Sequence, residues 1–373
     1  MRGGATSGVA LCRRFNISRV PADQWLNRFR AGRWKALKDK SRRPRHRARR
    51  TEPLWRERRM RRRQQRPTWG ARKIRGGWRA RYGRRGCPAV APISRWLKRE
   101  GLAAGRRRVK AGPRVIRPGW PRARSRNDVW TVDFKGGFRT GEGPRVDPLT
   151  VRDRYRRYGL RGALLRGQTV KQTQRAFVKI FQPYGLPQRM RSDHGVPFGG
   201  GGPTGLTRRS AGWIQRGIGV KFTTPGRPCE QGAPEPFHRV YQAEAASNPA
   251  RTRAGQPRRS HRWWRPYNPE RPHEALRMSV PAAFYRKSKR RRPASIQPWK
   301  YPAPWVRRWV KANGQIHGRG ARRLVGAAFG CDYVGMKPVR KGRWKVDYGP
   351  WLVGELQEQA SGVIRPAQYR RGQ

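Results

Sequence analysis

Apolar and polar residues alternate with a period of two in several short runs of the central part of the chain. In Trp130–Lys135 the apolar residues Trp130, Val132 and Phe134 alternate with polar ones, which is the pattern of a β-strand with one buried face. The other strand-like runs are Pro148–Val151, Tyr158–Leu165, Gln188–Ser192 and Val220–Thr223. Together these runs predict a sheet.

Between the third and fourth predicted strands, apolar residues recur in steps of three and four, which is the spacing of one helix face. The positions are Val170, Thr173, Phe177, Ile180 or Phe181, and Tyr184. Gly185 is the expected C′ residue of this helix, and Pro187 follows it. Further helices are expected around Trp213 and over Phe237–Ala245. This order of elements is that of a ribonuclease-H-like α/β fold, which we place at residues 126–290.

The first 115 residues are rich in arginine and contain two patterns typical of helix-turn-helix units. In the first pattern, Ser18 is the expected N-cap of a helix whose apolar face carries Trp25, Leu26 and Phe29. The residues facing outward are of types that contact bases and phosphates in a major groove. They are Arg19, Gln24, Asn27 and Arg28.

The second pattern runs through Trp69–Ile74, Trp78 and Tyr82 and resumes at Ile93–Leu97. Its candidate DNA contacts are Arg72, Lys73 and Arg95. An ordinary small helical bundle with a charged surface would give the same pattern, so both interpretations stay open. We therefore predict an all-α region with tandem helix-turn-helix units over residues 1–115.

The net charge narrows the class of partner. The chain has 91 lysines and arginines against 20 acidic residues, a formal charge of +71, and such a chain needs a polyanion or dense counterions. Basic residues alternate with aromatic ones, which favours nucleic acid. The four cysteines are scattered, as in proteins of a reducing compartment, and no run has the length of a membrane span. We expect a soluble, cytoplasmic, nucleoid-associated protein with no membrane partner and no small-molecule substrate.

Because acidic residues are scarce, their places in the sequence are informative. Asp133 lies inside the first predicted strand, Asp193 lies at the end of the fourth, and Glu235 lies just ahead of the helix that begins at Phe237. Three carboxylates converging from two strands and a helix supply the hard oxygen ligands that Mg²⁺ prefers. Two such ions promote in-line phosphoryl transfer. Each acid taken alone would be explained as the structural partner of an arginine.

Four motifs occur in order and together resemble insertion-sequence transposases that carry a retroviral-integrase-type (DDE) catalytic core. They are Trp130–Gly136, Arg191–Gly195, Gln231–Glu235 and Tyr267–Leu276. The last motif, Tyr-Asn-Pro-Glu-Arg-Pro-His-Glu-Ala-Leu, is the most specific. The resemblance covers nearly the whole chain.

The resemblance implies that Asp133, Asp193 and Glu235 are catalytic residues and ligands of Mg²⁺ or Mn²⁺. The implied reaction is hydrolysis at the ends of a mobile element, followed by attack of the freed 3′-OH on target DNA. The implied partner is double-stranded DNA, both terminal repeats and target, bound by a homo-oligomer. Arg271 and His273 are expected to face DNA, although a role in packing alone is an equal alternative.

The last part of the chain, residues 295–373, contains short β-like runs separated by glycines. Asn313–Gly314 is a hairpin signal, and strands are expected around Leu324–Val325 and Trp344–Val346. By the same resemblance, this region is a small all-β barrel that follows the core.

The segment around Glu235 departs from the family pattern, which is a few residues longer. The family has Lys-Val where this chain has Ala233-Pro234, and an arginine where it has Pro236. Proline disfavours the α conformation of the residue before it, so a helix is expected to begin at or after Pro236. The alternative function is therefore a catalytically decayed copy that only binds DNA sequence-specifically. A basic RNA-binding protein would explain the charge but not the ordered acidic motifs.

Overall fold

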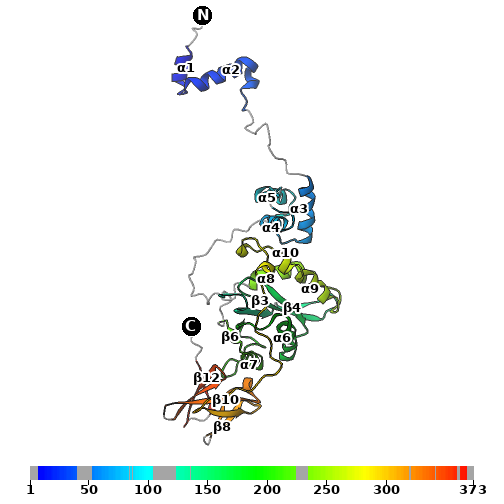
Figure 1. The fold of residues 1–373 in the computed structure, drawn as a ribbon. Coiled ribbons are helices and arrows are strands. Elements are labelled where there is room, and N and C mark those ends of the chain that lie inside the picture. The colour runs from blue at the N-terminus through cyan, green and yellow to red at the C-terminus, as the bar shows by residue number, and fades with distance from the viewer. Residues whose placement is uncertain are drawn as a thin grey trace. The chain divides into compact units, whose positions relative to one another are not determined.

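The computed structural model describes residues 7–39, 53–83, 85, 87–103, 123–134, 136–223, 234–318, 321–340, 342–358 and 362–367. The chain divides into two compact units, Met1–Glu52 and Pro53–Gln373 (Figure 1). The region predicted at residues 1–115 is therefore shared between the two units.

The first unit contains helices α1 (Gly8–Arg14) and α2 (Arg19–Ala36). Ser18 is the N-cap of α2, as predicted, although its side chain makes no capping hydrogen bond. Trp25, Leu26 and Phe29 lie on α2, the helix predicted to carry them, but neither helix contains a buried residue and both Trp25 and Leu26 are exposed. Two helices so rich in charge bury too little apolar surface for a core of their own.

The second unit begins with a bundle of three helices, α3 (Pro53–Gln65), α4 (Ala71–Tyr82) and α5 (Val90–Arg99). Six buried residues form its core. They are Trp55, Trp69, Ile74, Trp78, Ile93 and Leu97. The apolar pattern that was predicted for a second helical unit is thereby confirmed as a packed core, to which α3 adds Trp55.

A mixed sheet forms the centre of the second unit. Its strands are β1 (Val129–Phe134), β2 (Phe138–Arg139), β3 (Arg145–Asp153), β4 (Gly159–Leu165), β5 (Arg189–Ser192) and β6 (Gly219–Phe222). The order is β2-β3-β1-β5-β6, and β4 pairs with β3. Strands β1, β3 and β4 are antiparallel neighbours, whereas β5 and β6 continue the sheet in parallel with β1. The predicted order of elements is confirmed, with β2 in addition.

Helix α6 (Val170–Tyr184) lies between β4 and β5 in the chain, and α7 (Arg208–Ile214) connects the parallel strands β5 and β6. Helix α6 has the predicted bounds, buries Phe177 and Ile180 against the sheet, and ends at Gly185 with a φ of +76°. After β6, helix α8 (Pro234–Tyr241) continues into a π-helical turn over Gln242–Ala246. Helices α9 (Gln256–Trp264) and α10 (Tyr267–Glu270) follow.

Helix α8 begins earlier than predicted. We expected its start at or after Pro236, but it starts at Pro234 and includes Glu235 in its first turn. Proline is compatible with the first turn of a helix, where its missing N–H has no intrahelical partner to lose. The prolines therefore do not keep Glu235 out of the helix.

The C-terminal strands form two open sheets. The strands are β7 (Val306–Val310), β8 (Gln315–Gly318), β9 (Ala321–Leu324), β10 (Asp332–Arg340), β11 (Arg343–Tyr348), β12 (Trp351–Gln357), β13 (Gly362–Val363) and β14 (Arg365–Pro366). The sheets have the orders β14-β12-β11-β10-β7 and β13-β9-β8, so the described strands do not close into the predicted barrel. The turn at Asn313–Gly314 is present, with Gly314 at a φ of +85°. Across the described ranges, no helix has the length and apolar content to cross a membrane.

Candidate active site

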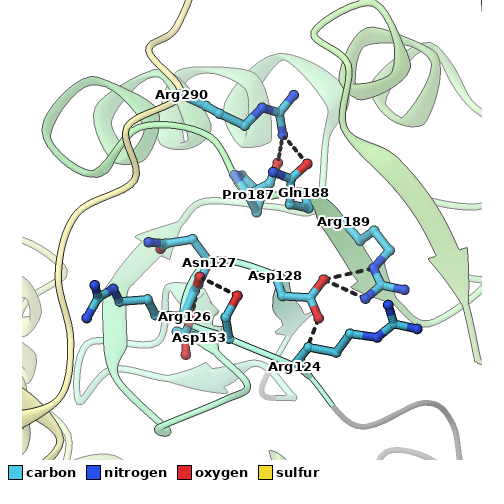
Figure 2. Close-up of polar contacts among 10 residues, drawn as sticks. Arg124, Arg126, Asn127, Asp128, Asp153, Pro187, Gln188, Arg189 and Arg290 are labelled. Carbon is cyan, nitrogen blue, oxygen red and sulfur yellow. Dashed lines mark hydrogen bonds and ion pairs between the residues drawn. The ribbon is translucent and has the colours of Figure 1, made fainter.

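Polar contacts at the amino ends of β1 and β5 tie these strands together (Figure 2). The Asp128 carboxylate accepts hydrogen bonds from the Arg124 backbone N–H at 2.8 Å and from Arg189 Nε at 3.2 Å. Burial acts to raise the pKa of Asp128, but these hydrogen bonds outweigh it and lower that pKa. The Asp153 carboxylate accepts a hydrogen bond from the backbone N–H of Asn127 at 2.6 Å. The first residues of both strands are thus held in place.

The register set by these contacts brings Asp133 and Asp193 to the same level. Thr131 of β1 stands opposite Arg191 of β5 in the parallel pair. Side chains two residues further along return to the same face, so Asp133 at the end of β1 stands level with Asp193, which directly follows β5. We call this pair of carboxylates the acidic edge.

Helix α8 packs against the acidic edge through His238. Nδ1 of His238 lies 3.5 Å from Oδ2 of Asp133, and its Nε2 lies 2.9 Å from Oγ1 of Thr150 on β3. The Thr150 hydroxyl also donates a hydrogen bond to the carbonyl oxygen of Asp133 at 3.1 Å. The side chains of Asp133 and His238 are only 16% and 12% exposed. These contacts fix the position of α8 relative to β1 and β3.

Glu235, the third predicted carboxylate ligand, lies in α8. Glu235 precedes His238 by three residues, which is about one helical turn, and nothing of its side chain is described. Within the described residues, no group of three His, Cys, Asp or Glu side chains could hold a metal ion. Asp133 and Asp193 provide hard carboxylate oxygens, and this donor chemistry fits a cation of the Mg²⁺ type.

Asp193 lies in a partly enclosed position at the end of β5. Burial raises its pKa, whereas a hydrogen bond from the Gly195 N–H and the neighbouring His194 act to lower it. The His194 ring packs against Phe222, with the ring centroids 5.0 Å apart. This contact supports a packing role for His194.

A second carboxylate site lies beyond α8, in the π-helical turn. The Glu244 carboxylate accepts hydrogen bonds from the Thr68 hydroxyl and from Trp263 Nε1, the latter at 2.7 Å, and lies 3.6 Å from Arg271 Nη1. The side chains of Glu244 and Arg271 are 5% and 7% exposed. We call these four residues the Glu244 junction. Because Thr68 lies between α3 and α4, the junction holds the three-helix bundle against the rest of the second unit.

Two further contacts hold the bundle at the same place. Arg62 and Arg66 approach the Glu270 carboxylate at 3.5 Å and 3.7 Å. Gly76 of α4 packs so closely on Pro272 that a Cβ on Gly76 would lie 3.1 Å from Pro272 Cβ. The junction was not predicted, since no sequence signal links Glu244 with a threonine far away in the chain.

Several side chains of the Tyr267–Leu276 motif make contacts within the protein. The Asn268 side chain accepts a hydrogen bond from the Gly159 N–H at 2.8 Å and donates one to the Gly159 carbonyl at 2.7 Å. Arg271 belongs to the Glu244 junction. Burial, together with Arg152, Arg271 and other cations, lowers the pKa of His273 to about 3, so this ring is neutral at pH 7. These contacts favour the packing alternative, and we do not propose Arg271 or His273 as DNA contacts.

The other predicted DNA contacts fall into two groups. Four are exposed on the helices where they were expected, namely Arg19, Gln24, Arg72 and Arg95. Arg28 instead donates hydrogen bonds to the carbonyls of Ala36 at 3.0 Å and Lys38 at 2.6 Å. Burial lowers the pKa of Lys73, which lies among the charges of Arg271, Glu274 and Glu244. The side chain of Lys73 thus lies near the segment that follows α8, not on the exposed surface of α4.

Comparisons with known proteins give two family matches. The Helix-turn-helix domain model matches residues 1–45, and the Integrase core domain model matches residues 216–281. A similar curated protein is the uncharacterized 31.7 kDa protein of insertion element IS407 from Burkholderia multivorans. It is 28% identical over 199 residues, which cover 52% of this chain and 67% of the relative. These matches confirm the resemblance to insertion-sequence transposases with an integrase-type core.

Solved structures give weaker matches. The HTLV-2 integrase catalytic core domain in complex with magnesium is 11% identical and covers 44% of this chain and 100% of its own, with a TM-score of 0.33. A simian T-cell lymphotropic virus intasome in complex with PP2A regulatory subunit B56 gamma is 13% identical over 71% of this chain and 90% of its own, with a TM-score of 0.36. Scores of this size do not assign a role to any residue.

Proposed function

We propose that this chain is a DDE-type transposase that binds the ends of a mobile element, cleaves them and joins the 3′-OH ends to target DNA with a divalent metal. The observation that carries the proposal is the parallel register of β1 and β5, in which Thr131 lies opposite Arg191. Two residues further along both strands, the same register leads to Asp133 and Asp193, the acidic edge. The Helix-turn-helix and Integrase core matches support DNA recombination as the general activity. Two element ends joined in one event require two active sites, so we propose a homo-oligomer on DNA.

In this proposal, Asp133, Asp193 and Glu235 would hold Mg²⁺ or Mn²⁺. A bound divalent ion stabilises charge on the attacking and leaving oxygens of a phosphoryl transfer. The chain's own part is to keep these ligands in position. The Thr150 hydroxyl holds the Asp133 carbonyl, and His238 spans the Asp133 carboxylate and Thr150. Small displacements matter, because about 1 Å of misplacement can cost roughly 10²-fold in rate.

A joining assay tests the proposal. A labelled duplex with the terminal sequence that flanks the gene is incubated with a supercoiled target and Mg²⁺, with and without chelator. We expect joined product from the unmodified chain only when metal is present, and no product from Asp133→Asn or Asp193→Asn. Joined product that persists in either variant, or in chelator, would overturn the proposal.

A second candidate function is DNA binding alone, by a copy that has lost catalysis. The departure of the Glu235 segment from the family pattern favours it, because this chain has Ala233, Pro234 and Pro236 where the family has lysine, valine and arginine. The same assay separates the two functions. Tight binding to the terminal duplex with no nicking in Mg²⁺ or Mn²⁺ would establish the second.

A further inference from the structure

A groove with a volume of about 300 Å³ runs between α3 and α4 on the three-helix bundle. Four arginines line it together with a single glutamate: Arg58, Arg61, Arg62, Arg81 and Glu57. The charged side chains of the lining therefore carry three net positive charges in a concave surface. Such a surface concentrates positive potential and attracts anions. We call it the α3–α4 groove.

Aromatic rings hold two of these arginines. The Arg58 guanidinium lies 4.2 Å from the centroid of the Tyr82 ring and 5.0 Å from that of Trp55. Arg81 lies 5.7 Å from the same Tyr82 ring. A guanidinium held against a ring loses less side-chain freedom on binding, and its planar fork matches the paired oxygens of a phosphate. The groove thus presents pre-positioned phosphate ligands.

The arginines on the buried side of the groove outnumber the carboxylates near them. Burial lowers the pKa of Arg62, Glu270 acts to raise it, and the neighbouring cations Arg66 and Arg81 lower it further. Glu270 is the carboxylate that Arg62 contacts, at 3.5 Å, and both Arg62 and Arg66 share it. An anion in the groove would relieve the repulsion among these guanidinium groups.

We propose that the α3–α4 groove binds the phosphate backbone of duplex DNA, an inference that rests on the proposed function for the identity of the polyanion. The grip would be independent of base sequence, since phosphates carry no sequence information. The Glu244 junction fixes the bundle to the helical segment that continues from α8. DNA in the groove would therefore be held at a fixed place relative to the acidic edge.

The test measures DNA binding by fluorescence anisotropy over a range of salt concentrations, without metal, in full-length chain carrying Asp133→Asn. The groove variant is Arg61→Gln with Arg81→Gln. Its matched control is Arg258→Gln with Arg262→Gln, two exposed arginines on the outer face of α9. Each lost phosphate contact reduces the slope of log K against log salt by about 0.9, so the groove variant should lose about 1.8. The loss should be equal for random and terminal-repeat duplexes.

Two outcomes would overturn the inference. One is a groove variant whose salt slope equals that of the α9 control, which would show that the loss of binding follows from the lower net charge alone. The other is a loss confined to the terminal-repeat duplex, which would indicate base contacts. A third variant, Arg58→Lys, keeps the charge but loses the planar fork, so we expect several-fold weaker binding with an unchanged slope. An unchanged affinity of Arg58→Lys would contradict the stacking argument.

Intrinsic tryptophan fluorescence reports whether each variant is folded, and three of the 16 tryptophans, Trp55, Trp69 and Trp78, lie in the core of the bundle. The result of this binding test does not depend on whether the proposed joining activity is present. Binding is measured without metal in a joining-inactive background, so a negative result leaves metal-dependent joining intact. A failure of the joining assay likewise leaves the salt slopes unchanged.

Discussion

The acidic edge and the Glu244 junction both place carboxylates within a strongly basic chain, but their surroundings differ. At the junction, one carboxylate is almost fully buried and faces an arginine, an indole N–H and a hydroxyl. At the edge, Asp133 lies in β1 and Asp193 directly follows the neighbouring parallel strand β5, and Asp133 has a histidine at 3.5 Å. Loss of the carboxylate from a buried ion pair is strongly destabilising, because it leaves an uncompensated buried charge.

This difference separates two roles for scarce acidic residues. Removing Glu244 would leave Arg271 buried without its counter-ion, so the cost should appear as lost stability. Asp133→Asn keeps the size of the side chain beside His238, so the cost should appear in chemistry and not in folding. The predictions that follow test this separation.

The largest effect is expected for Asp133→Asn. The amide has nearly the same size, so thermal unfolding should change little. Joining activity should fall at least about 10³-fold, which exceeds the roughly 10–100-fold loss typical of residues that only orient a metal ligand. Parallel joining assays and unfolding curves check this. A large loss of stability together with activity would place Asp133 in the same structural class as Glu244.

Glu244→Gln should destabilise the second unit by about 3 kcal/mol, because breaking a buried ion pair leaves an uncompensated charge. Urea unfolding followed by tryptophan fluorescence measures the change. Adding Arg271→Gln should recover part of the loss, as expected for coupled residues. The control is Glu142→Gln, whose partner Arg251 is 89% exposed and whose ion pair should contribute no more than about 1 kcal/mol. Equal effects of Glu244→Gln and the control would refute the junction.

Restoring the family pattern around Glu235 should raise joining activity. The triple variant Ala233→Lys, Pro234→Val and Pro236→Arg adds two cations next to Glu235 in the sequence, and one charged hydrogen bond to a DNA phosphate contributes about 1.5 kcal/mol, so joining should rise by about tenfold. Adding Asp133→Asn to the triple variant should abolish the gain. Unchanged joining by the triple variant would show that the family residues at these positions do not limit catalysis.

The smallest effect is expected for Asp128→Asn at the amino end of β1. The folded state lowers the pKa of Asp128, so its contribution to stability is present above the unfolded pKa of about 3.9 and is lost as pH falls through the lower folded pKa. At neutral pH the variant should lose about 1–2 kcal/mol, since its hydrogen bonds involve a charged group. Unfolding midpoints of both chains should converge as pH falls below that range. A constant difference down to acid pH would exclude the ionised carboxylate as the cause.

Local signals predicted the central fold well. The periodicity of α6 and its terminal glycine gave the bounds of the helix because both are properties of consecutive residues. Burial of the apolar residues on α2 could not be predicted in this way. Periodicity shows that Trp25 and Leu26 share a side of a helix, but not that another element covers them. Closure of the C-terminal sheets likewise depends on pairings between distant strands.

The two carboxylate sites were predictable to different degrees. Asp133 and Asp193 could be chosen as candidates from the sequence because one lies inside a predicted strand and the other at the end of one, and β1 and β5 are parallel neighbours in the structure. Glu244 was missed because its partner Thr68 lies 176 residues away in the sequence. Arg271 was expected to face DNA because of the family resemblance of its motif, with packing as an equal alternative, and only the tertiary structure shows its burial beside Glu244.

Binding of Mn²⁺ to the chain, followed by electron paramagnetic resonance of the free ion, tests most directly whether Asp133 and Asp193 act as one cation site. We expect the unmodified chain to bind Mn²⁺, and Asp133→Asn and Asp193→Asn each to weaken binding by at least about tenfold, the lower range seen when a metal site loses a supporting group. Glu244→Gln should leave binding unchanged. Equal Mn²⁺ binding by the unmodified chain and both aspartate variants would contradict the assignment of the acidic edge.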